Sequence, residues 1–413
     1  MHSSLQTVTA EATHMPQQVS KPVIGNAARR VGRRTAALLA VGSLCLLAGC
    51  SSLNPFSSKK VRNEPAPLQQ FKTTMATRTL WTAEIGKSGD YFLSPAVHGG
   101  KVYAASAAGE LASFDAANGK QLWRTNAGTG ITAGVATDGN TIAVGGTDGA
   151  LMAFDAATGK LRWKMQASTE ILSSPAIGNG LVVVRSMDNL IAAYDAETGT
   201  RRWFVQRSAP PLVLRAAPGI VIGDGLAYVA LPAGRLLALS TVTGVARWEA
   251  TIAEPRGATE LERVADVSGM PVLLSRDLCA ASYQGRIACV DAGNGSMRWA
   301  RELSAEVGPG IDQRYVFAAD EKGNLLAFSR DAGSNLWRNT SLAHRRLTAP
   351  VSFGRAVVVG DREGYLHFLS REEGAMLARV GTGSSAIRAT PIVAGASLIV
   401  QNTDGKLVAV STD

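Results

Sequence analysis

The sequence has little of what catalysis or metal binding requires. Its 413 residues include only four cysteines, none adjacent to another and none in a Cys-x-x-Cys pair. Its five histidines lack the spacing of metal ligands, and no G-x-S-x-G, phosphate-loop or EF-hand pattern occurs. These absences argue against redox, hydrolytic and metal enzymes. We therefore expect no catalytic residue, no cofactor and no metal.

Two further absences concern the fold and the charge. No window shows the helical spacing of apolar residues, whereas 43 glycines punctuate runs that are rich in β-branched residues, so a β-rich fold is favoured. No block of like charge occurs, and the formal charge falls from +9 to +5 when the five Lys/Arg and one Glu of residues 1–49 are removed. A mildly basic chain with mixed charges along its loops predicts no nucleic-acid partner.

The first fifty residues form an export signal that ends at a cysteine. NAARRVGRR supplies a cationic segment, and TAALLAVGSLCLLAG supplies an apolar run too short to span a bilayer as a stable helix. Leu47, Ala48, Gly49 and Cys50 resemble the bacterial lipobox, which implies cleavage before Cys50 and acylation of its thiol. Ser51, rather than Asp, implies transfer to the inner leaflet of the outer membrane, facing the periplasm. The alternative is a plain secretory signal in which Cys50 is incidental.

Three regions follow from this interpretation. Residues 1–49 are the signal peptide, with either Met1 or Met15 as the start, residues 50–77 are the lipidated cysteine and a flexible tether, and residues 78–413 are the folded body. Cys279 and Cys289 are then the cysteines left in an oxidising compartment. They flank the turn SYQGR, and the sequence leaves open whether they form a disulfide or remain two buried thiols.

One motif, L-x-A-Φ-D-x-x-T-G-x-x-x-W with Φ aromatic or aliphatic, recurs about every forty residues. Its Asp accepts backbone N–H groups of a turn, and its Gly supplies positive φ. Its Trp buries a large ring against the neighbouring repeat, and its indole N–H needs an acceptor. We therefore predict a structural docking role for all seven tryptophans, which are Trp81, Trp123, Trp163, Trp203, Trp248, Trp299 and Trp337.

Three turn signals in each repeat imply four short strands, which is the signature of a β-propeller rather than of an α-solenoid. The last copy, GKLVAVSTD, lacks an outer strand, and RTLW near residue 80 is an outer strand with no blade before it. Joining these fragments gives seven complete blades and one split blade. The sequence thus predicts an all-β, eight-bladed propeller of four-stranded antiparallel blades, closed by an N-terminal outer strand.

The repeat resembles the tryptophan-docking motif of quinoprotein dehydrogenases, eight-bladed enzymes that hold pyrroloquinoline quinone on the ring axis. Those enzymes carry a vicinal cysteine pair, an axial aspartate and carboxylates for calcium. This chain has no adjacent cysteines, and turns account for its repeated aspartates. A periplasmic dehydrogenase-like propeller remains the second functional hypothesis.

Two repeats are lengthened by the segments QRSAPPLVLRAAPG, residues 206–219, and EPRGATELERVADVSGMP, residues 254–271. Together with the lipobox, tether and eight blades, they resemble the PQQ-like-repeat lipoproteins of the outer-membrane β-barrel assembly machinery, over essentially the whole mature chain. The resemblance implies a non-catalytic scaffold whose two loops dock on the POTRA domains of the central barrel subunit. The partner-binding residues that it implies are Leu212, Leu214, Arg215, Asp266 and Ser268.

Ser268 stands where the family has a second aspartate. From the residues alone, Leu212 and Leu214 would form a small exposed apolar patch, and the alternative is that both complete a strand of the fourth blade. Further implied partners are the other lipoproteins of the complex and unfolded outer-membrane precursors. Precursor strands would bind at exposed blade edges by β-augmentation.

Overall fold

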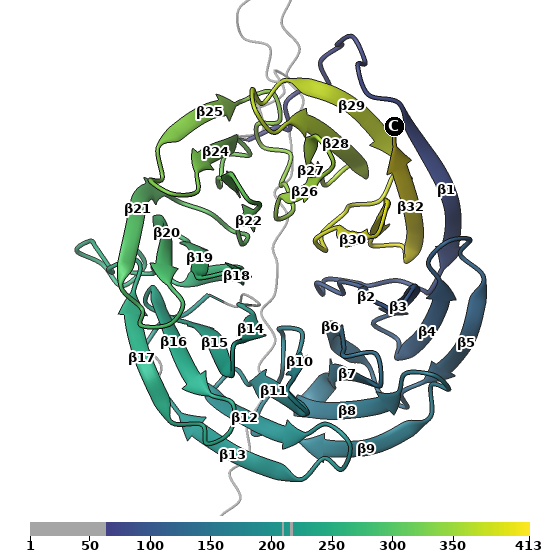
Figure 1. The fold of residues 1–413 in the computed structure, drawn as a ribbon, viewed down its shortest axis with the longest axis vertical. Helices are drawn as coiled ribbons and strands as arrows, with labels where there is room; N and C mark the ends of the chain where they lie inside the picture. Colours follow the sequence, from purple (N-terminus) through teal and green to yellow (C-terminus); the bar gives the residue numbers. More distant parts are fainter. Residues whose placement is uncertain (1–62, 209, 215–217) are drawn as a thin grey trace, which may run out of the picture. The chain divides into compact units, whose positions relative to one another are not determined.

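The computed structural model describes residues 63–208, 210–214 and 218–413, which form a ring of eight four-stranded antiparallel sheets (Figure 1). The predicted all-β, eight-bladed propeller is confirmed. The predicted signal peptide, Cys50 and Arg215 lie outside the described residues. Within the described ranges, no helix has the length and apolar character needed to cross a membrane.

The blades are numbered here along the chain, each from its innermost to its outermost strand. Blade 1 consists of β2 (Ala96–His98), β3 (Lys101–Ala105), β4 (Glu110–Asp115) and β5 (Gln121–Asn126). Blade 2 consists of β6 (Ile131–Thr137), β7 (Thr141–Gly146), the 3-10 turn η1 (Thr147–Gly149), β8 (Ala150–Asp155) and β9 (Leu161–Gln166). Blade 3 consists of β10 (Ala176–Gly178), β11 (Leu181–Arg185), β12 (Leu190–Asp195) and β13 (Arg201–Gln206). Blade 4 consists of β14 (Ile220–Gly223), β15 (Leu226–Leu231), β16 (Arg235–Ser240) and β17 (Ala246–Thr251).

The second half of the ring repeats this order. Blade 5 consists of β18 (Val267–Leu274), β19 (Asp277–Ser282), β20 (Gly285–Asp291) and β21 (Met297–Leu303). Blade 6 consists of β22 (Gly310–Ile311), β23 (Tyr315–Ala319), β24 (Leu325–Ser329) and β25 (Asn335–Asn339). Blade 7 consists of β26 (Val351–Phe353), β27 (Ala356–Gly360), β28 (Tyr365–Ser370) and β29 (Met376–Gly381). Blade 8 is split between the chain ends and consists of β30 (Ile392–Ala394), β31 (Ser397–Gln401), β32 (Lys406–Thr412) and β1 (Thr77–Glu84).

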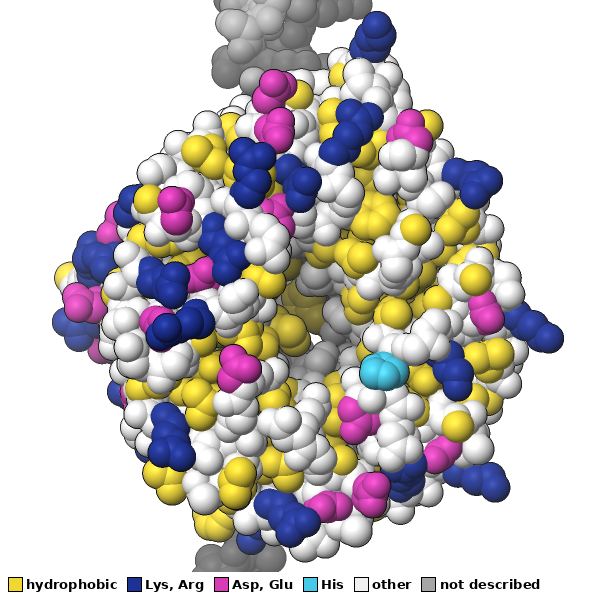
Figure 2. Space-filling view, viewed as in Figure 1, with side chains coloured by type: hydrophobic (Ala, Val, Ile, Leu, Met, Phe, Trp, Pro, Cys, Tyr) yellow, Lys and Arg dark blue, Asp and Glu magenta, His cyan; other side chains and the backbone are white. Residues whose placement is uncertain are grey.

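The hydrophobic core lies between blades rather than inside any one of them. Middle strands such as β7 are buried along their whole length, because a neighbouring sheet covers each face. Outer strands such as β9 alternate between buried and exposed residues, since only one face meets a neighbour. Charged side chains lie around the periphery of the face shown in Figure 2, and hydrophobic side chains surround its central hollow.

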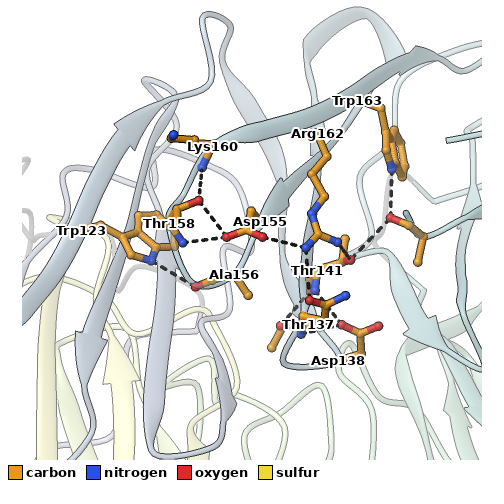
Figure 3. Close-up of polar contacts among 12 residues, drawn as sticks. Trp123, Thr137, Asp138, Thr141, Asp155, Ala156, Thr158, Lys160, Arg162 and Trp163 are labelled. Atoms are coloured by element: carbon orange, nitrogen blue, oxygen red, sulfur yellow. Dashed lines mark hydrogen bonds and ion pairs between the residues drawn. The ribbon is translucent and has the colours of Figure 1, made fainter. Parts of the chain in front are cut away.

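Each tryptophan docks on the turn of the next blade, and Figure 3 shows the contact of Trp123. At the junction of blades 1 and 2, the Trp123 indole Nε1 donates to the Ala156 carbonyl oxygen at 3.1 Å. A Cβ added to Gly159 would lie only 2.6 Å from the nearest carbon of the Trp123 indole, so the indole occupies the space that a side chain would need. The same pair of contacts occurs at seven junctions, from the tryptophans at 81, 123, 163, 203, 248, 299 and 337 to the turns at 116–119, 156–159, 196–199, 241–244, 292–295, 330–333 and 371–374.

The turn that receives Trp123 is fixed by the carboxylate of Asp155. Asp155 Oδ1 accepts the Thr158 backbone N–H at 2.9 Å and the Thr158 hydroxyl at 2.8 Å. Its Oδ2 accepts a hydrogen bond from Arg162 at 2.7 Å. The Arg162 hydrogen bond, followed by that of Thr158, lowers the pKa of Asp155 to about 2. The aspartate is therefore an ionised structural acceptor at neutral and mildly acidic pH.

The eighth junction, between blades 7 and 8, is built differently. Ala378 stands in the position of the tryptophan, and the ring is closed by β1 pairing antiparallel with β32. Met75, just before β1, is buried in the cluster that contains Ala378, and the Thr74 backbone N–H donates to the Leu377 carbonyl at 3.0 Å. The segment before β1 thus fills the junction that lacks a tryptophan.

This packing shortens the tether predicted for residues 50–77. The Ala66 backbone N–H donates to the Ala343 carbonyl, and Arg345 donates back to the Ala66 carbonyl at 2.8 Å. Arg379 donates to the Gln69 carbonyl at 3.1 Å. From residue 66 onward the chain is therefore bound to blade 7 and its neighbouring loop, because arginines of the ring satisfy its backbone carbonyls.

Arg345, which binds the Ala66 carbonyl, also belongs to a buried cluster of charged and titratable side chains in blade 7 and its neighbouring loop. Arg345 and His367 both bind the Asp361 carboxylate, at 2.7 Å and 2.8 Å, and all three side chains are buried. Arg379 Nε points at His367 Nδ1, at 3.4 Å, so the neutral imidazole with its proton on Nε2 satisfies both contacts. Burial lowers the pKa of His367, against the raising effect of Asp361.

Gly159→Ala should destabilise the ring more than Gly180→Ala. Both glycines have positive φ, 71° and 74°, so each alanine carries a backbone strain of about 1–2 kcal/mol. Only at Gly159 would the new Cβ also overlap a ring, that of Trp123, which adds about 1–3 kcal/mol. Urea unfolding monitored by tryptophan fluorescence measures both variants. Equal losses of unfolding free energy in the two variants would show that the contact between the Trp123 indole and Gly159 contributes nothing to stability.

The stability of blade 7 should fall as the pH drops below about 6.5, because His367 is buried as the neutral imidazole. Its folded-state pKa lies below the unfolded value, so the unfolded chain binds the extra proton first. The contribution of neutral His367 to the free energy of unfolding is complete above the pKa of the unfolded state. It is lost as the pH falls through the pKa of the folded state. His367→Gln should unfold with a smaller difference in midpoint between pH 7 and pH 5 than the wild type. Identical differences would contradict a neutral buried histidine.

Candidate functional site

The two lengthened loops lie on the same face of the ring. Each joins an outer strand to the innermost strand of the next blade, β13 to β14 and β17 to β18, and strand direction alternates within every blade. The loops also touch, because the Gly219 backbone N–H donates to the Gly269 carbonyl at 2.9 Å. Met270 packs against Gly219, where a Cβ would lie 3.0 Å from the Met270 Cγ. They form one continuous surface, called here the loop surface (residues 206–208, 210–214, 218–219 and 254–271).

Asp266 holds the loop surface together from the inside. Its Oδ2 accepts the Leu214 backbone N–H at 2.7 Å, and its Oδ1 accepts the Ala233 backbone N–H at 2.9 Å. The residue is only 5% exposed. Two backbone donors thus occupy both carboxylate oxygens of Asp266. Ser268 is buried as well, with its hydroxyl directed at the Asp266 carbonyl.

The two leucines of the first loop have different positions. Leu212 is 40% exposed, and Leu214 is half-buried at the rim of the axial cavity. Neither belongs to a strand, so the alternative in which they complete a strand of blade 4 is not what the structure has. Of the five residues predicted to bind a partner, only Leu212 therefore combines exposure with a large apolar side chain among those described.

Sequence reasoning missed Leu261, which is 72% exposed on the second loop. The loop is shaped by Glu262, whose carboxylate accepts the backbone N–H groups of Ala258 and Thr259 at 2.9 Å and 3.0 Å. The sequence did contain a signal for its exposure, which is a single leucine between charged residues in EPRGATELERVADVSGMP. An apolar side chain in such a loop does not pack into a blade and is left on the surface. Leu212, Leu261 and Met270 are the large exposed hydrophobic side chains in the described parts of the two loops.

The axis of the ring encloses a cavity of about 980 Å³, lined by the innermost strands of all eight blades. Among the described residues that line it, only Tyr283, Glu306 and Arg388 have ionisable side chains. The described parts of the chain hold no cluster of three or more potential metal ligands. These residues do not fit a quinone with a calcium ion, which needs several converging carboxylates and cationic donors.

Cys279 and Cys289 are joined by a disulfide in the structure. They stand directly opposite each other on β19 and β20, and both are fully buried in the cluster that also contains Trp299. The bond cross-links two strands that are already paired within blade 5. Its position inside the core, away from the loop surface, makes it part of the blade architecture.

The tryptophan-docked blades and the apolar axis define a β-propeller of the quinoprotein-repeat type, in which the described residues along the axis do not include the quinoprotein donor set. The chain belongs to the family of outer membrane protein assembly factor BamB, whose model matches residues 72–126, 107–339 and 322–413. The BamB of Bordetella pertussis is 42% identical over 382 residues, 92% of this chain and 98% of that protein. The BamB of Pseudomonas aeruginosa is 43% identical over 377 residues, 91% of this chain and 97% of that protein.

Solved structures agree with this assignment. The crystal structure of BamB from Moraxella catarrhalis superposes with a TM-score of 0.75 at 27% identity, over 81% of this chain and all of that one. A quinohemoprotein alcohol dehydrogenase from Comamonas testosteroni superposes with a TM-score of 0.62 at 14% identity, over 81% of this chain and 76% of that one. The second likeness shows a shared fold alone.

Asp266→Ala should destabilise the protein by about 2–4 kcal/mol, because it leaves the Leu214 and Ala233 N–H groups without their charged acceptor. Glu260→Ala, on the exposed side of the second loop, should stay within about 0.5 kcal/mol of the wild type. Urea unfolding gives the free energies, and hydrogen exchange should show faster exchange at the Leu214 and Ala233 amides. Unchanged exchange at both amides would mean that Asp266 does not hold the loop.

Proposed function

We propose that this chain is a non-catalytic scaffold of outer-membrane protein assembly. The observation that carries the proposal is membership of the BamB family, whose relatives are named outer membrane protein assembly factors, combined with the joined loops on one face. The apolar axis supports the non-catalytic part, since no acid–base pair or metal-ligand set converges there among the described residues. In this role the propeller supplies a rigid surface to its partners.

The loop surface is the proposed docking site for the POTRA domains of the central barrel subunit. Leu212 and Leu261 offer apolar contacts next to polar residues, which matches the apolar core and polar rim of protein interfaces. Arg215 is proposed as a directional donor at the same place. Asp266 and Ser268 act from below by fixing the backbone that presents these side chains.

The proposed location is the inner leaflet of the outer membrane, through acyl chains on Cys50. Residues from 66 onward, which follow that anchor in the sequence, are bound to blade 7. In the order of the ring, blade 7 is four blades from blade 3, from which the first loop departs (Figure 1). We infer that the segment from residue 66 onward joins the ring at a blade that does not carry the loop surface, which leaves the loops free for a partner.

Other lipoproteins of the assembly complex and unfolded precursors are further proposed partners. The outer strands leave one edge of each blade unpaired, and such an edge can accept an incoming strand. This contact would lie at the periphery of the ring, away from the loop surface. The scaffold can therefore bind the barrel subunit and a precursor without competition.

Leu212→Asp should abolish co-purification with the central barrel subunit, because it places a charge in the apolar centre of the interface. Leu161→Asp is the matched control, since Leu161 is also an exposed leucine, 53% against 40% for Leu212, and lies on the outer strand β9 of blade 2. Recovery from detergent-solubilised outer membranes is measured by quantitative mass spectrometry, with urea unfolding to verify folding. Full recovery of the barrel subunit with Leu212→Asp, and with the double variant that adds Arg215→Glu, would refute this docking site.

A further inference from the structure

A second cavity, of about 210 Å³, opens beside the first loop, between blades 3 and 4. It is lined by Asn189 in the turn between β11 and β12, by Ala233 in the turn between β15 and β16, and by Arg207 and Pro210 at the start of the loop. A water molecule occupies about 30 Å³ in the liquid, so the cavity has room for a group the size of a carboxylate and its stem. It lies on the face of the ring that carries the loop surface, and loop residues form one wall.

Two arginines line the cavity, and they differ in their partners. Arg235 is neutralised by Glu249, at 2.5 Å. Arg207 forms no ion pair with any carboxylate among the described residues, and its buried Nε has no acceptor there. Its backbone N–H is anchored to the Asn189 carbonyl at 3.2 Å, which fixes the side chain at this wall. A cation without a counter-ion is thus built into the cavity lining.

A third arginine stands behind the cavity. Arg185 is 7% exposed, its NH1 group donates to Asn189 Oδ1 at 2.7 Å, and its buried Nε has no acceptor among the described residues. Burial lowers the pKa of Arg185 to about 10, although the charge of Asp266 opposes this. Because Asn189 uses its oxygen for Arg185, its amide NH₂ is the group left to donate towards a ligand. Asn189 therefore links the buried Arg185 to the cavity wall.

Burying guanidinium N–H groups without acceptors is costly, and an anion that supplies oxygens recovers that cost. Arginine recognises carboxylates through two parallel hydrogen bonds, and the amide NH₂ of Asn189 can add a third. Pro210 on the wall and Leu212 two residues further on give the charged centre an apolar border. This combination is typical of an interface pocket that receives a side chain, rather than of a site for a free ion.

We propose that the cavity beside Arg207 receives the carboxylate of an aspartate or glutamate presented by the protein that docks on the loop surface. The proposal rests on the proposed function and adds the chemistry of the partner residue. Arg207 pairs with the carboxylate, and Asn189 donates to it. Arg185 contributes its charge from behind, and Arg235 stays occupied by Glu249.

Binding to the purified POTRA domains of the same organism tests the pairing. Arg207→Met should weaken binding at least about tenfold, mainly through faster dissociation, and Arg207→Lys should fall between it and the wild type. Arg202→Met is the control, because Arg202 lies on β13 of the same blade and pairs with Asp195 at the surface. One acidic residue of the POTRA domains should show non-additive losses with Arg207→Met in a double-mutant cycle. Wild-type affinity of Arg207→Met would overturn the proposal.

If the wild type does not bind the POTRA domains, that result refutes the proposed function but not the carboxylate site. A second measurement then tests whether the cavity beside Arg207 binds a carboxylate. N-acetylglutamate amide, with one carboxylate, is compared with the neutral N-acetylglutamine amide at matched ionic strength. The carboxylate should raise the thermal midpoint of the wild type and of Arg202→Met relative to the neutral compound, but not that of Arg207→Met. The absence of any difference between the two compounds would overturn the proposal for the cavity itself.

Discussion

The contact between a tryptophan ring and the turn glycine of the next blade is the interaction on which the whole ring depends. Each indole covers a turn whose glycine leaves no room for a side chain, and the indole N–H closes a hydrogen bond to the carbonyl three residues earlier. The contact joins residues of two neighbouring blades, so it couples blades rather than stabilising one. Repeating it seven times gives a closed array with few degrees of freedom.

Two features of the protein are not explained by the tryptophan contacts, namely how the ring closes and which residues are left to bind a partner. Closure is achieved by β1, which pairs with β32, and by Met75, which fills the junction that lacks a tryptophan. We propose that function lies in the segments that depart from the repeat, because the repeat residues are committed to blade contacts. The loop surface is such a departure, and Asp266 makes it rigid by tying the first loop to blade 4 and the start of blade 5.

The fold was predictable from the sequence because its determinants are local and periodic. Asp, Gly and Trp at fixed spacing dictate a turn and its contact, and counting the copies gives the number of blades and the split one. The burial of Asp266 was not predictable, since its backbone partners at 214 and 233 are distant in sequence. The same holds for Met75, which resembles part of a polar tether until blade 7 is placed beside it. The cavity at Arg207 joins three segments that no motif links.

Hydrogen exchange on the intact protein, with and without the POTRA domains of the central barrel subunit, tests the central claim most directly. We expect protection at residues 206–219 and 254–271, with the outer strands β5 and β9 unchanged. Asp266 already orders the backbone of the loops in the free protein. Some loop amides should therefore exchange slowly before the partner is added, and partner binding should slow exchange in the loops further. Protection at the outer strands or around the axis, with none at the two loops, would contradict the assignment of the docking surface.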